Sequence, residues 1–372
     1  MENDEYIGTP IDGKAMAAHI TEQLKEIIEK DKLAPYKDGK FNTESMLPSK
    51  MKLIIVTTGD SAAGASYVTS KITKCNELGI MAIIIHYDFL SSDAVNNLCT
   101  RLSKYDYPPF IIQLPIIGDN TRMEIYEKLF TNMKANGSFE FDDDIRKHIA
   151  MMDVDGIISP DNILYTYAPT HMIDMDLHSL ISYHNLPCTP IGIMYMLDKT
   201  LGKDLSGLSA TILGRSELVS KPLYQYLMDR DCTVTMCHSK TNKYDITEYI
   251  KNSDIIISAM GKLNELSDAI NILTDKAKEN LNLDKKVLID VSINRGSDGK
   301  LHGDCDIETA KKFKYYTPVP GGVGPMTVAM LMCNVVKYYQ NTYQSNYAGS
   351  IIPVYPMKIS PKSIDIYRYT MI

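Results

Sequence analysis

Tyr67 and Lys71 are the first residues whose types and spacing could do chemistry. They stand four apart in a helical pattern, so their side chains share one face of the helix. The helix follows the apolar run "KLIIVT", and α/β proteins bind ligands at the carboxyl ends of such strands. A tyrosine can stack on a ring, and a lysine can act as a general acid or base. An isolated pair of this kind is more often a surface lysine beside a half-buried tyrosine.

The order of the motifs excludes one dehydrogenase class. With the preceding "TTGDSAAG", the YxxxK pattern is similar to that of short-chain dehydrogenases. In that class the glycine turn lies far upstream of the tyrosine, whereas Gly59 and Tyr67 are only eight residues apart here. The tyrosine and lysine must therefore serve another purpose.

A second stretch with chemical potential is "PVPGGVGP" at 318–325, which runs into "MTVAMLMCNVVKYY". A Gly-rich turn between strand and helix is the simplest interpretation. Glycine also lets the backbone approach a ligand closely, and helix N-termini attract anions. The stretch alone favours neither interpretation.

A dinucleotide-binding βαβ unit is predicted between residues 206 and 241. The turn departs from GxGxxG, because Ser216 and Ser220 stand where the second and third glycines would be after Gly214. An NAD site usually presents Asp or Glu at the end of the second strand. Positions 233–241 read "TVTMCHSKT", with hydroxyl and basic donors and no carboxylate. This composition favours the 2′-phosphate of NADP over NAD.

Length and charge limit the remaining classes. A chain of 372 residues is long enough for about two domains, and a net charge of -7 argues against nucleic acid as a partner. No apolar run approaches the roughly 20 residues that span a bilayer. The acidic N-terminus "MENDEYIG" lacks a signal core, and seven cysteines without a CxxC pair favour neither zinc nor disulfides. We expect a cytoplasmic protein without a metal or membrane span.

The elements that must position these residues alternate along the chain. Helical patterns such as 13–30 and 92–105 alternate with β-rich runs such as 52–59 and 80–88, which predicts parallel strands with crossover helices. Polar, turn-rich segments interrupt the rhythm and are interpreted as surface insertions. They lie at 35–50, 133–148 and 163–186.

The chain as a whole resembles the bifunctional methylenetetrahydrofolate dehydrogenase/cyclohydrolase family. Its motifs occur in family order across residues 9–340, and they read "IDGK", "YVTSK", "QLPI", "DVDG", "PCTPIGI", "LGRSELVSKP", "TVTMCHSKT", "GDCD" and "TPVPGGVGPMTVAMLM". The resemblance implies a two-domain α/β fold. A folate-binding domain at 1–188, completed by 326–345, would be followed by a doubly wound Rossmann-type NADP-binding domain at 189–325. The C-terminal helix would return to the first domain, and homodimers are a family expectation.

The resemblance also implies site residues. Lys71 would be the general acid/base of cyclohydrolysis, since partial burial beside a cationic substrate favours loss of its proton. Gln113 would orient Lys71 or the water, Tyr67 would stack on the aminobenzoyl ring, and Asp155 would accept N–H bonds from the pterin. Further substrate contacts would come from Pro320, Gly321, Gly322 and Val323. The cofactor would be held by Gly214, Arg215, Ser216, His238, Ser239, Thr241, Ile293 and Gly324.

The sequence departs from the family at several positions: Gly64, Ser220, Leu263 and Ser292. The tail at 346–372 lies beyond the matched region and has no predicted role. Two other functions remain in competition. A dehydrogenase lacking the second activity is disfavoured by the presence of Lys71. A non-catalytic NADP-binding scaffold would not explain why Tyr67, Lys71, Gln113 and Asp155 occur together.

Overall fold

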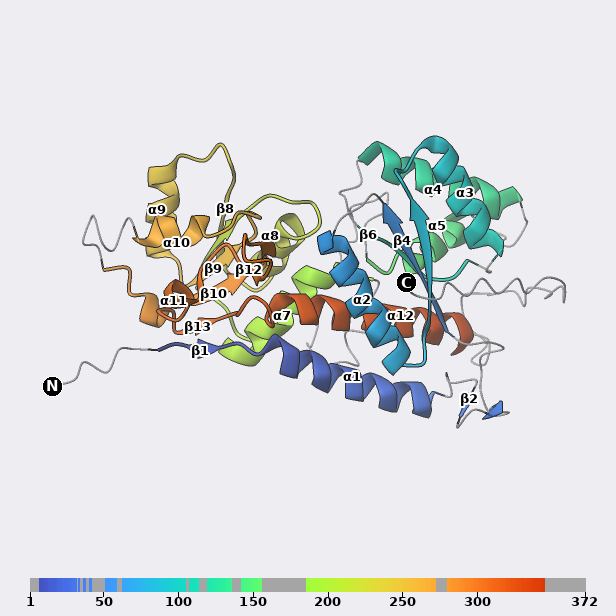
Figure 1. The fold of residues 1–372 in the computed structure, drawn as a ribbon, viewed down its shortest axis with the longest axis horizontal. Coiled ribbons are helices and arrows are strands. Elements are labelled where there is room, and N and C mark those ends of the chain that lie inside the picture. Colours follow the sequence, from blue (N-terminus) through green and yellow to red (C-terminus); the bar gives the residue numbers. More distant parts are fainter. Residues whose placement is uncertain are drawn as a thin grey trace.

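Two α/β units lie side by side in the computed structural model and are joined along one side by long helices (Figure 1). The structure describes residues 7–31, 33, 36–37, 40–41, 51–58, 62–104, 107–113, 119–135, 142–155, 185–271 and 280–344. The expected insertion at 163–186 lies outside the described residues except for Asn185 and Leu186, which are buried.

The first unit is built on a three-stranded parallel sheet in the order β5-β4-β6. Its strands are β4 (Lys52–Thr58), β5 (Met81–Tyr87) and β6 (Phe110–Gln113). In the central strand β4, Leu53, Ile54, Ile55 and Val56 are fully buried, as expected for a strand covered on both faces. The crossover connections are the helices α2 (Ala62–Glu77) and α3 (Ser92–Lys104).

The prediction of a surface insertion at 133–148 is wrong for the first and the last residues of this range, which are helical. Its start belongs to α4 (Asp119–Ala135) and its end to α5 (Asp142–Met152). In α5, Ile145, Ile149 and Met152 are fully or almost fully buried. Their spacing of four and three residues is that of one helix face. The three aspartates that begin α5 made this stretch of the sequence resemble a polar loop.

The expected insertion at 35–50 contains a short antiparallel pair, β2 (Tyr36–Lys37) and β3 (Lys40–Phe41). Its other residues lie outside the described part of the chain.

The second unit is built on a six-stranded parallel sheet in the order β1-β13-β10-β9-β7-β8. Its four main strands are β7 (Ser209–Leu213), β8 (Thr233–Cys237), β9 (Ile255–Ser258) and β10 (Val287–Asp290). The helices between and beside them are α8 (Ser220–Met228), α9 (Lys243–Asn252), α10 (Glu265–Asn271), α11 (Ile307–Ala310) and the 3-10 turn Leu283–Lys285. A hairpin of β11 (Asn294–Arg295) and β12 (Leu301–His302) follows β10. This is the predicted Rossmann-type arrangement.

One edge of this sheet comes from the start of the chain. The strand β1 (Thr9–Pro10) pairs in parallel with β13 (Tyr315–Tyr316), although residues 1–188 were all expected in the first unit. Two-residue strands carry no detectable alternation of apolar residues, so the sequence pattern gave no signal for this pairing.

Three long helices form the layer that joins the units: α1 (Gly13–Lys30), α7 (Cys188–Leu201) and α12 (Val323–Gln344). The helix α12 packs against α1, α7 and α2, so the C-terminal helix returns to the first unit as predicted. It begins at Val323, whereas the loop was expected to continue through Pro325. Proline is tolerated in the first turn of a helix, where its missing N–H has no partner to lose.

A buried ion pair attaches α7 to the second unit. Nη1 and Nη2 of Arg230, just after α8, donate to the Asp198 carboxylate at 3.1 and 3.2 Å.

Within the described residues no helix is both long and apolar enough to cross a membrane.

Candidate active site

The predicted pair Tyr67 and Lys71 lies on α2, and the lysine is buried. Lys71 is only 5% exposed, which is unlike the surface lysine of the alternative interpretation. Tyr67 is half-buried, and its burial raises the pKa of its hydroxyl. One turn further along, burial raises the pKa of the Cys75 thiol to about 12, an effect that the positive charge of Lys71 partly offsets. The helix thus presents a cation to the interior of the first unit.

Asp155 lies near the same charge. The segment that carries it follows a single parallel bridge between Asp153 and Phe110 of β6, and Asp155 itself is half-buried in the next turn. Burial raises the pKa of the Cys188 thiol well above its ordinary value; the Asp155 charge raises it further and the Lys71 charge lowers it. Both side chains are therefore close enough to act on one thiol.

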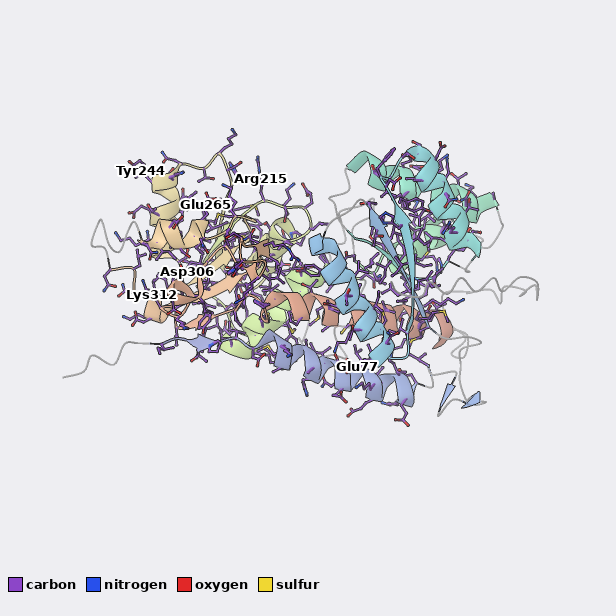
Figure 2. All side chains as sticks on the ribbon, viewed as in Figure 1. Glu77, Arg215, Tyr244, Glu265, Asp306 and Lys312 are labelled. Carbon is purple, nitrogen blue, oxygen red and sulfur yellow. The ribbon has the colours of Figure 1, made fainter. Side chains whose placement is uncertain are left out.

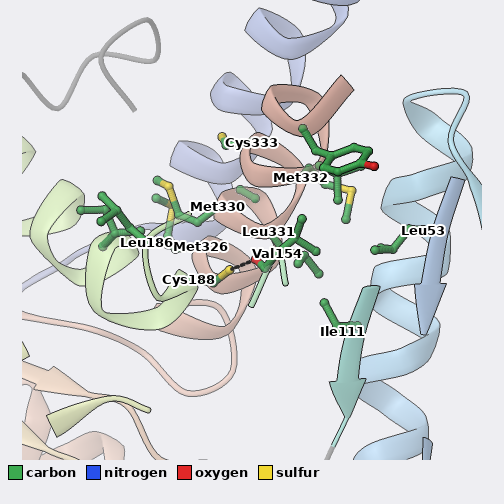
Figure 3. Close-up of a cluster of buried hydrophobic side chains, with 14 of the residues drawn as sticks. Leu53, Ile111, Val154, Leu186, Cys188, Met326, Met330, Leu331, Met332 and Cys333 are labelled. Atoms are coloured by element: carbon green, nitrogen blue, oxygen red, sulfur yellow. Dashed lines mark hydrogen bonds between the residues drawn. The ribbon is translucent and has the colours of Figure 1, made fainter. Parts of the chain in front are cut away.

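Asn334 of α12 fixes the segments that carry these groups. Its amide nitrogen donates to the Val154 carbonyl at 2.9 Å and to the Leu186 carbonyl at 3.0 Å. The Cys188 thiol donates to the same Val154 carbonyl at 3.4 Å, beside α12 (Figure 3). Sequence reasoning assigned no role to Asn334 or Cys188. The available signal was a lone polar residue inside the apolar run "MLMCNVV".

Gly321 and Gly322 of the 318–325 loop are required for different physical reasons. Gly321 has a φ of +115°, a conformation that residues with a side chain rarely adopt. A Cβ on Gly322 would lie 2.7 Å from both the Pro318 carbonyl oxygen and the Thr317 Cβ. The Gly321 carbonyl accepts a hydrogen bond from the Lys14 N–H at 3.0 Å, which seats the loop on the start of α1. Gly321 and Gly322 are therefore required by the fold itself.

Gly324 has no such requirement. Its φ is not positive, and an added Cβ would make only ordinary contacts, 3.7 Å from the Tyr67 hydroxyl and 3.6 Å from Ile293 Cδ1. Tyr67 belongs to the first unit, Ile293 follows β10 of the second, and Gly324 lies in the first turn of α12. Both units and the connecting loop therefore meet at this glycine.

The remaining predicted substrate residues are placed as follows. Val323 is buried as the first residue of α12, and Pro320 is exposed. Gln113 ends β6, where its backbone pairs with Thr57 at the carboxyl edge of the sheet. The side chain of Gln113 lies outside the described residues.

The turn after β7 packs tightly against the ends of two neighbouring strands. Gly214 has a φ of +143°, and its N–H donates to the Cys237 carbonyl at 2.9 Å. An added Cβ would lie 2.6 Å from the Ala259 carbonyl oxygen and 3.0 Å from Ser220 Oγ. Ser220, which replaces a glycine of the usual fingerprint, is fully buried there, so the departure is accommodated at the start of α8.

The polar residues of this turn face solvent. Ser216 is exposed, and its hydroxyl oxygen accepts from the N–H groups of Val219 and Ser220 at 3.2 Å. Arg215 is exposed and lies on the same side of the second unit as Tyr244 (Figure 2). An exposed guanidinium beside a glycine turn is suited to a phosphate group.

The end of β8 forms a small turn. The His238 N–H donates to Thr241 Oγ1 at 3.0 Å, and the Thr241 N–H donates to the His238 carbonyl at 2.8 Å. Ser239, between them, is exposed. Because the Gly214 N–H bonds to the last residue of β8, this turn and the glycine turn share one edge of the sheet. The two turns offer exposed hydroxyl, backbone and guanidinium donors, and the turn after β8 carries no carboxylate, which fits an NADP 2′-phosphate.

Comparison with known proteins supports the same interpretation. Residues 187–343 match the family model described as tetrahydrofolate dehydrogenase/cyclohydrolase, NAD(P)-binding domain. The protein named bifunctional protein FolD from Campylobacter jejuni is 33% identical over 338 residues, covering 90% of this chain and 99% of the relative. That from Bacillus licheniformis is 34% identical over 341 residues, with the same coverage.

Solved structures agree with the sequence relatives. The bifunctional FolD enzyme from Campylobacter jejuni superposes with a TM-score of 0.65 at 31% identity, covering 90% of this chain and 99% of that one. The Trypanosoma brucei enzyme, solved with NADP and an inhibitor, has a TM-score of 0.63 at 22% identity, covers 91% and 99%, and supports the fold. With a match over 90% of the chain at this identity, and with the glycine turn, the returning helix and the shared glycine all in place, the chain belongs to the tetrahydrofolate dehydrogenase/cyclohydrolase family.

Proposed function

We propose that the chain oxidises 5,10-methylenetetrahydrofolate to 5,10-methenyltetrahydrofolate with NADP and then hydrolyses the product to 10-formyltetrahydrofolate. The observation that carries the proposal is the meeting of Tyr67, Ile293 and Gly324, with the buried Lys71 one helical turn from Tyr67. A site between a folate unit and a cofactor unit needs such a point of contact, because the two reactants must be held together.

The oxidation needs alignment more than a proton donor. A ring-nitrogen lone pair of the substrate expels hydride and leaves the methenyl cation, and NADP+ supplies the hydride acceptor when bound. Tyr67 stacks on the aminobenzoyl ring and Asp155 accepts N–H bonds from the pterin. The missing side chain of Gly324 leaves room at the contact between the units. These groups hold the donor carbon in place during transfer.

The hydrolysis needs proton transfer. Water adds to the methenyl carbon and loses a proton; the carbon–nitrogen bond then breaks, and the departing nitrogen receives a proton. Lys71 is the general acid/base for these transfers, and Gln113 orients it or the water. The burial of Lys71 supports this role over the surface lysine, and it disfavours the dehydrogenase-only and scaffold alternatives. An assay of the purified protein with methylenetetrahydrofolate and each cofactor tests both reactions; absence of either would overturn the proposal.

Cofactor choice is assigned to Arg215 and Ser239, which recognise the 2′-phosphate of NADP. Arg215→Ala should raise the KM for NADP about ten- to a hundredfold and leave that for NAD unchanged, since a charge-assisted bond contributes about 1.5–3 kcal/mol. Lys221→Ala is the matched control, because this exposed cation is already paired with Glu217. Equal effects of Arg215→Ala on both cofactors would contradict the assignment.

We also infer that the active form is a homodimer in the cytoplasm. The edge strand β5 exposes Met81 and Ile84, and within the described residues only β4 pairs with it. A second copy can add its own β5 around a two-fold axis.

The cysteines support the cytoplasm as the location. All seven are free thiols, which suits a reducing compartment.

A further inference from the structure

A buried carboxylate in the second unit collects donors from two separate loops. Asp304 is fully buried, and its Oδ2 accepts from Ser258 Oγ at 2.8 Å, from the Met260 N–H at 2.9 Å and from Ser292 Oγ at 2.6 Å. Its Oδ1 accepts from the Lys262 N–H at 2.7 Å and from the Asn294 amide at 3.1 Å. Five donors saturate the acceptor capacity of one carboxylate.

The donors come from the carboxyl ends of adjacent strands. Ser258 ends β9 and residues 259–262 follow it, whereas residues 292–294 follow β10. The two strands pair in parallel. Both loops therefore leave the same edge of the sheet, where α/β proteins bind ligands. Asp304 comes from a third segment, 303–306, and ties the two loops together. We call Asp304 and its five donors the Asp304 clamp.

Ser292 makes the link between the loops direct. Its hydroxyl donates to Asp304 and accepts from the Gly261 N–H at 3.0 Å, so one side chain bridges the loop after β9 and the loop after β10. Ser292 is only 8% exposed. The next residue is Ile293, whose Cδ1 reaches the contact point at Gly324. A shift of Ser292 would therefore move one of the three residues that meet between the units.

A second carboxyl holds the clamp from the other side. Asp290 accepts from the Cys305 N–H at 2.8 Å and from the Ser292 N–H at 3.2 Å. A Cβ on Gly303 would lie 2.0 Å from Asp290 Oδ2, so segment 303–306 fits closely against this group. The position of Asp304 is therefore fixed independently of its five donors.

We propose that Asp304 and Ser292 are positioning residues for the hydride-transfer step, because they set the two loops against which the cofactor binds. The inference rests on the proposed function. Cyclohydrolysis of added methenyltetrahydrofolate relies on Lys71 and Gln113 of the first unit and uses no hydride acceptor. Loss of the clamp therefore lowers the dehydrogenase activity and NADP binding and leaves cyclohydrolysis unchanged.

The test compares Ser292→Ala and Asp304→Asn with the wild type in three measurements. These are NADP binding by calorimetry without folate, cyclohydrolysis without cofactor, and dehydrogenase turnover. We expect weaker NADP binding and a dehydrogenase kcat/KM lowered about 10- to 100-fold, since a misplacement of about 1 Å can cost that much. The effects of the two substitutions should not add, because both break one network. If Asp304→Asn does not fold, Ser292→Ala decides alone.

Ser267→Ala is the matched control. Ser267 is also buried and anchors the same segment, accepting from the Asp306 N–H at 2.6 Å, but it lies on α10 and, among the described residues, hydrogen-bonds to neither loop. It should lower the free energy of unfolding without changing the ratio of the two activities. A ratio unchanged in Ser292→Ala, or a parallel loss of both activities, would overturn the inference. Absence of either activity in the wild type would instead overturn the proposed function.

Discussion

Lys71 and Gly324 contribute to the candidate site in two different ways, one by its charge and the other by the space it leaves. Lys71 places a cation in the interior of the first unit, at 5% exposure, near the Asp155 carboxylate. Gly324 contributes by lacking a side chain at the one point where Tyr67 and Ile293 approach each other.

Substituting Lys71 should separate the two activities. Lys71→Met keeps the length of the side chain but removes the titratable group, so hydrolysis of methenyltetrahydrofolate should fall about 100- to 10,000-fold while dehydrogenase turnover survives. Methenyl absorbance followed in both directions measures the two rates, after subtraction of uncatalysed hydrolysis. Lys74→Met, at a half-buried cation paired with Glu77 on the same helix, is the control. Near-normal cyclohydrolysis in Lys71→Met would exclude Lys71 as the acid/base.

Two glycine substitutions should have opposite consequences. Gly324→Ala should leave the melting temperature unchanged or slightly raised, because its Cβ meets no clash and alanine favours helices. It should lower both activities, because the methyl group occupies the space between Tyr67 and Ile293. Gly322→Ala should lower the melting temperature, because its Cβ would clash with Thr317 and Pro318. Full activity in Gly324→Ala would show that no ligand needs this space.

At the scale of elements, α12 has two different roles. Asn334 and Tyr338 attach it to the first unit, since Tyr338 Oη donates to the Tyr107 carbonyl at 2.8 Å. Lys337 lies among the buried side chains of the helix and is only 2% exposed. Its ammonium has no hydrogen-bond partner within the described residues, and burial lowers the pKa of Lys337 to about 7. The helix therefore carries a destabilising group in its packed face.

Removing this group should stabilise the protein in a pH-dependent way. Between pH 7 and 10.5 the unfolded chain holds a proton on Lys337 that the native state has lost, so the stability of the wild type rises with pH over this range. Lys337→Met should raise the free energy of unfolding at pH 7 by about 1–4 kcal/mol, and the gain should shrink toward pH 10.5.

The control is a second buried lysine with partners. Lys286 Nζ donates to the carbonyls of Lys251 and Ser253, so Lys286→Met leaves two acceptors unsatisfied and should lower stability. Denaturant unfolding at several pH values measures all three proteins. A loss of stability in Lys337→Met at pH 7 would contradict the prediction.

At the scale of the whole molecule, the helices α1, α7 and α12 couple two units that are each built on a parallel sheet (Figure 1). The six-stranded sheet ends at β1 on one edge, and the three-stranded sheet ends at β5, whose exposed Ile84 and Met81 leave an apolar edge. Long apolar edge strands favour pairing with another chain. This edge is the surface on which the proposed homodimer depends.

A charge at that edge should separate the subunits. Ile84→Lys should convert the particle seen by light scattering from dimer to monomer, because a lysine on an edge strand opposes pairing. Met228→Lys, at a residue of similar exposure on α8, should leave the dimer intact. A wild type that is monomeric at micromolar concentration, or a dimer unaffected by Ile84→Lys, would exclude this interface.

The sequence by itself determined the features that depend on neighbouring residues. The apolar spacing of 13–30 predicted α1 with its observed bounds, and the run 52–59 predicted β4 within one residue. The missing carboxylate at 233–241 favoured NADP, and the ordered motifs indicated the family, which the comparisons confirm. Helical period, turn chemistry and motif order all act over a few residues, so a linear pattern records them.

The tertiary structure decided what depends on distant residues. Asn334 reaches the Val154 carbonyl across 180 positions of the chain, and β1 pairs with a strand more than 300 residues away. Gly322 and Gly324 are surrounded differently, and five donors meet at Asp304, only because the fold brings separate segments together. Hydrogen bonds and van der Waals contacts act at a few ångströms in space, so no pattern of spacing along the chain encodes them.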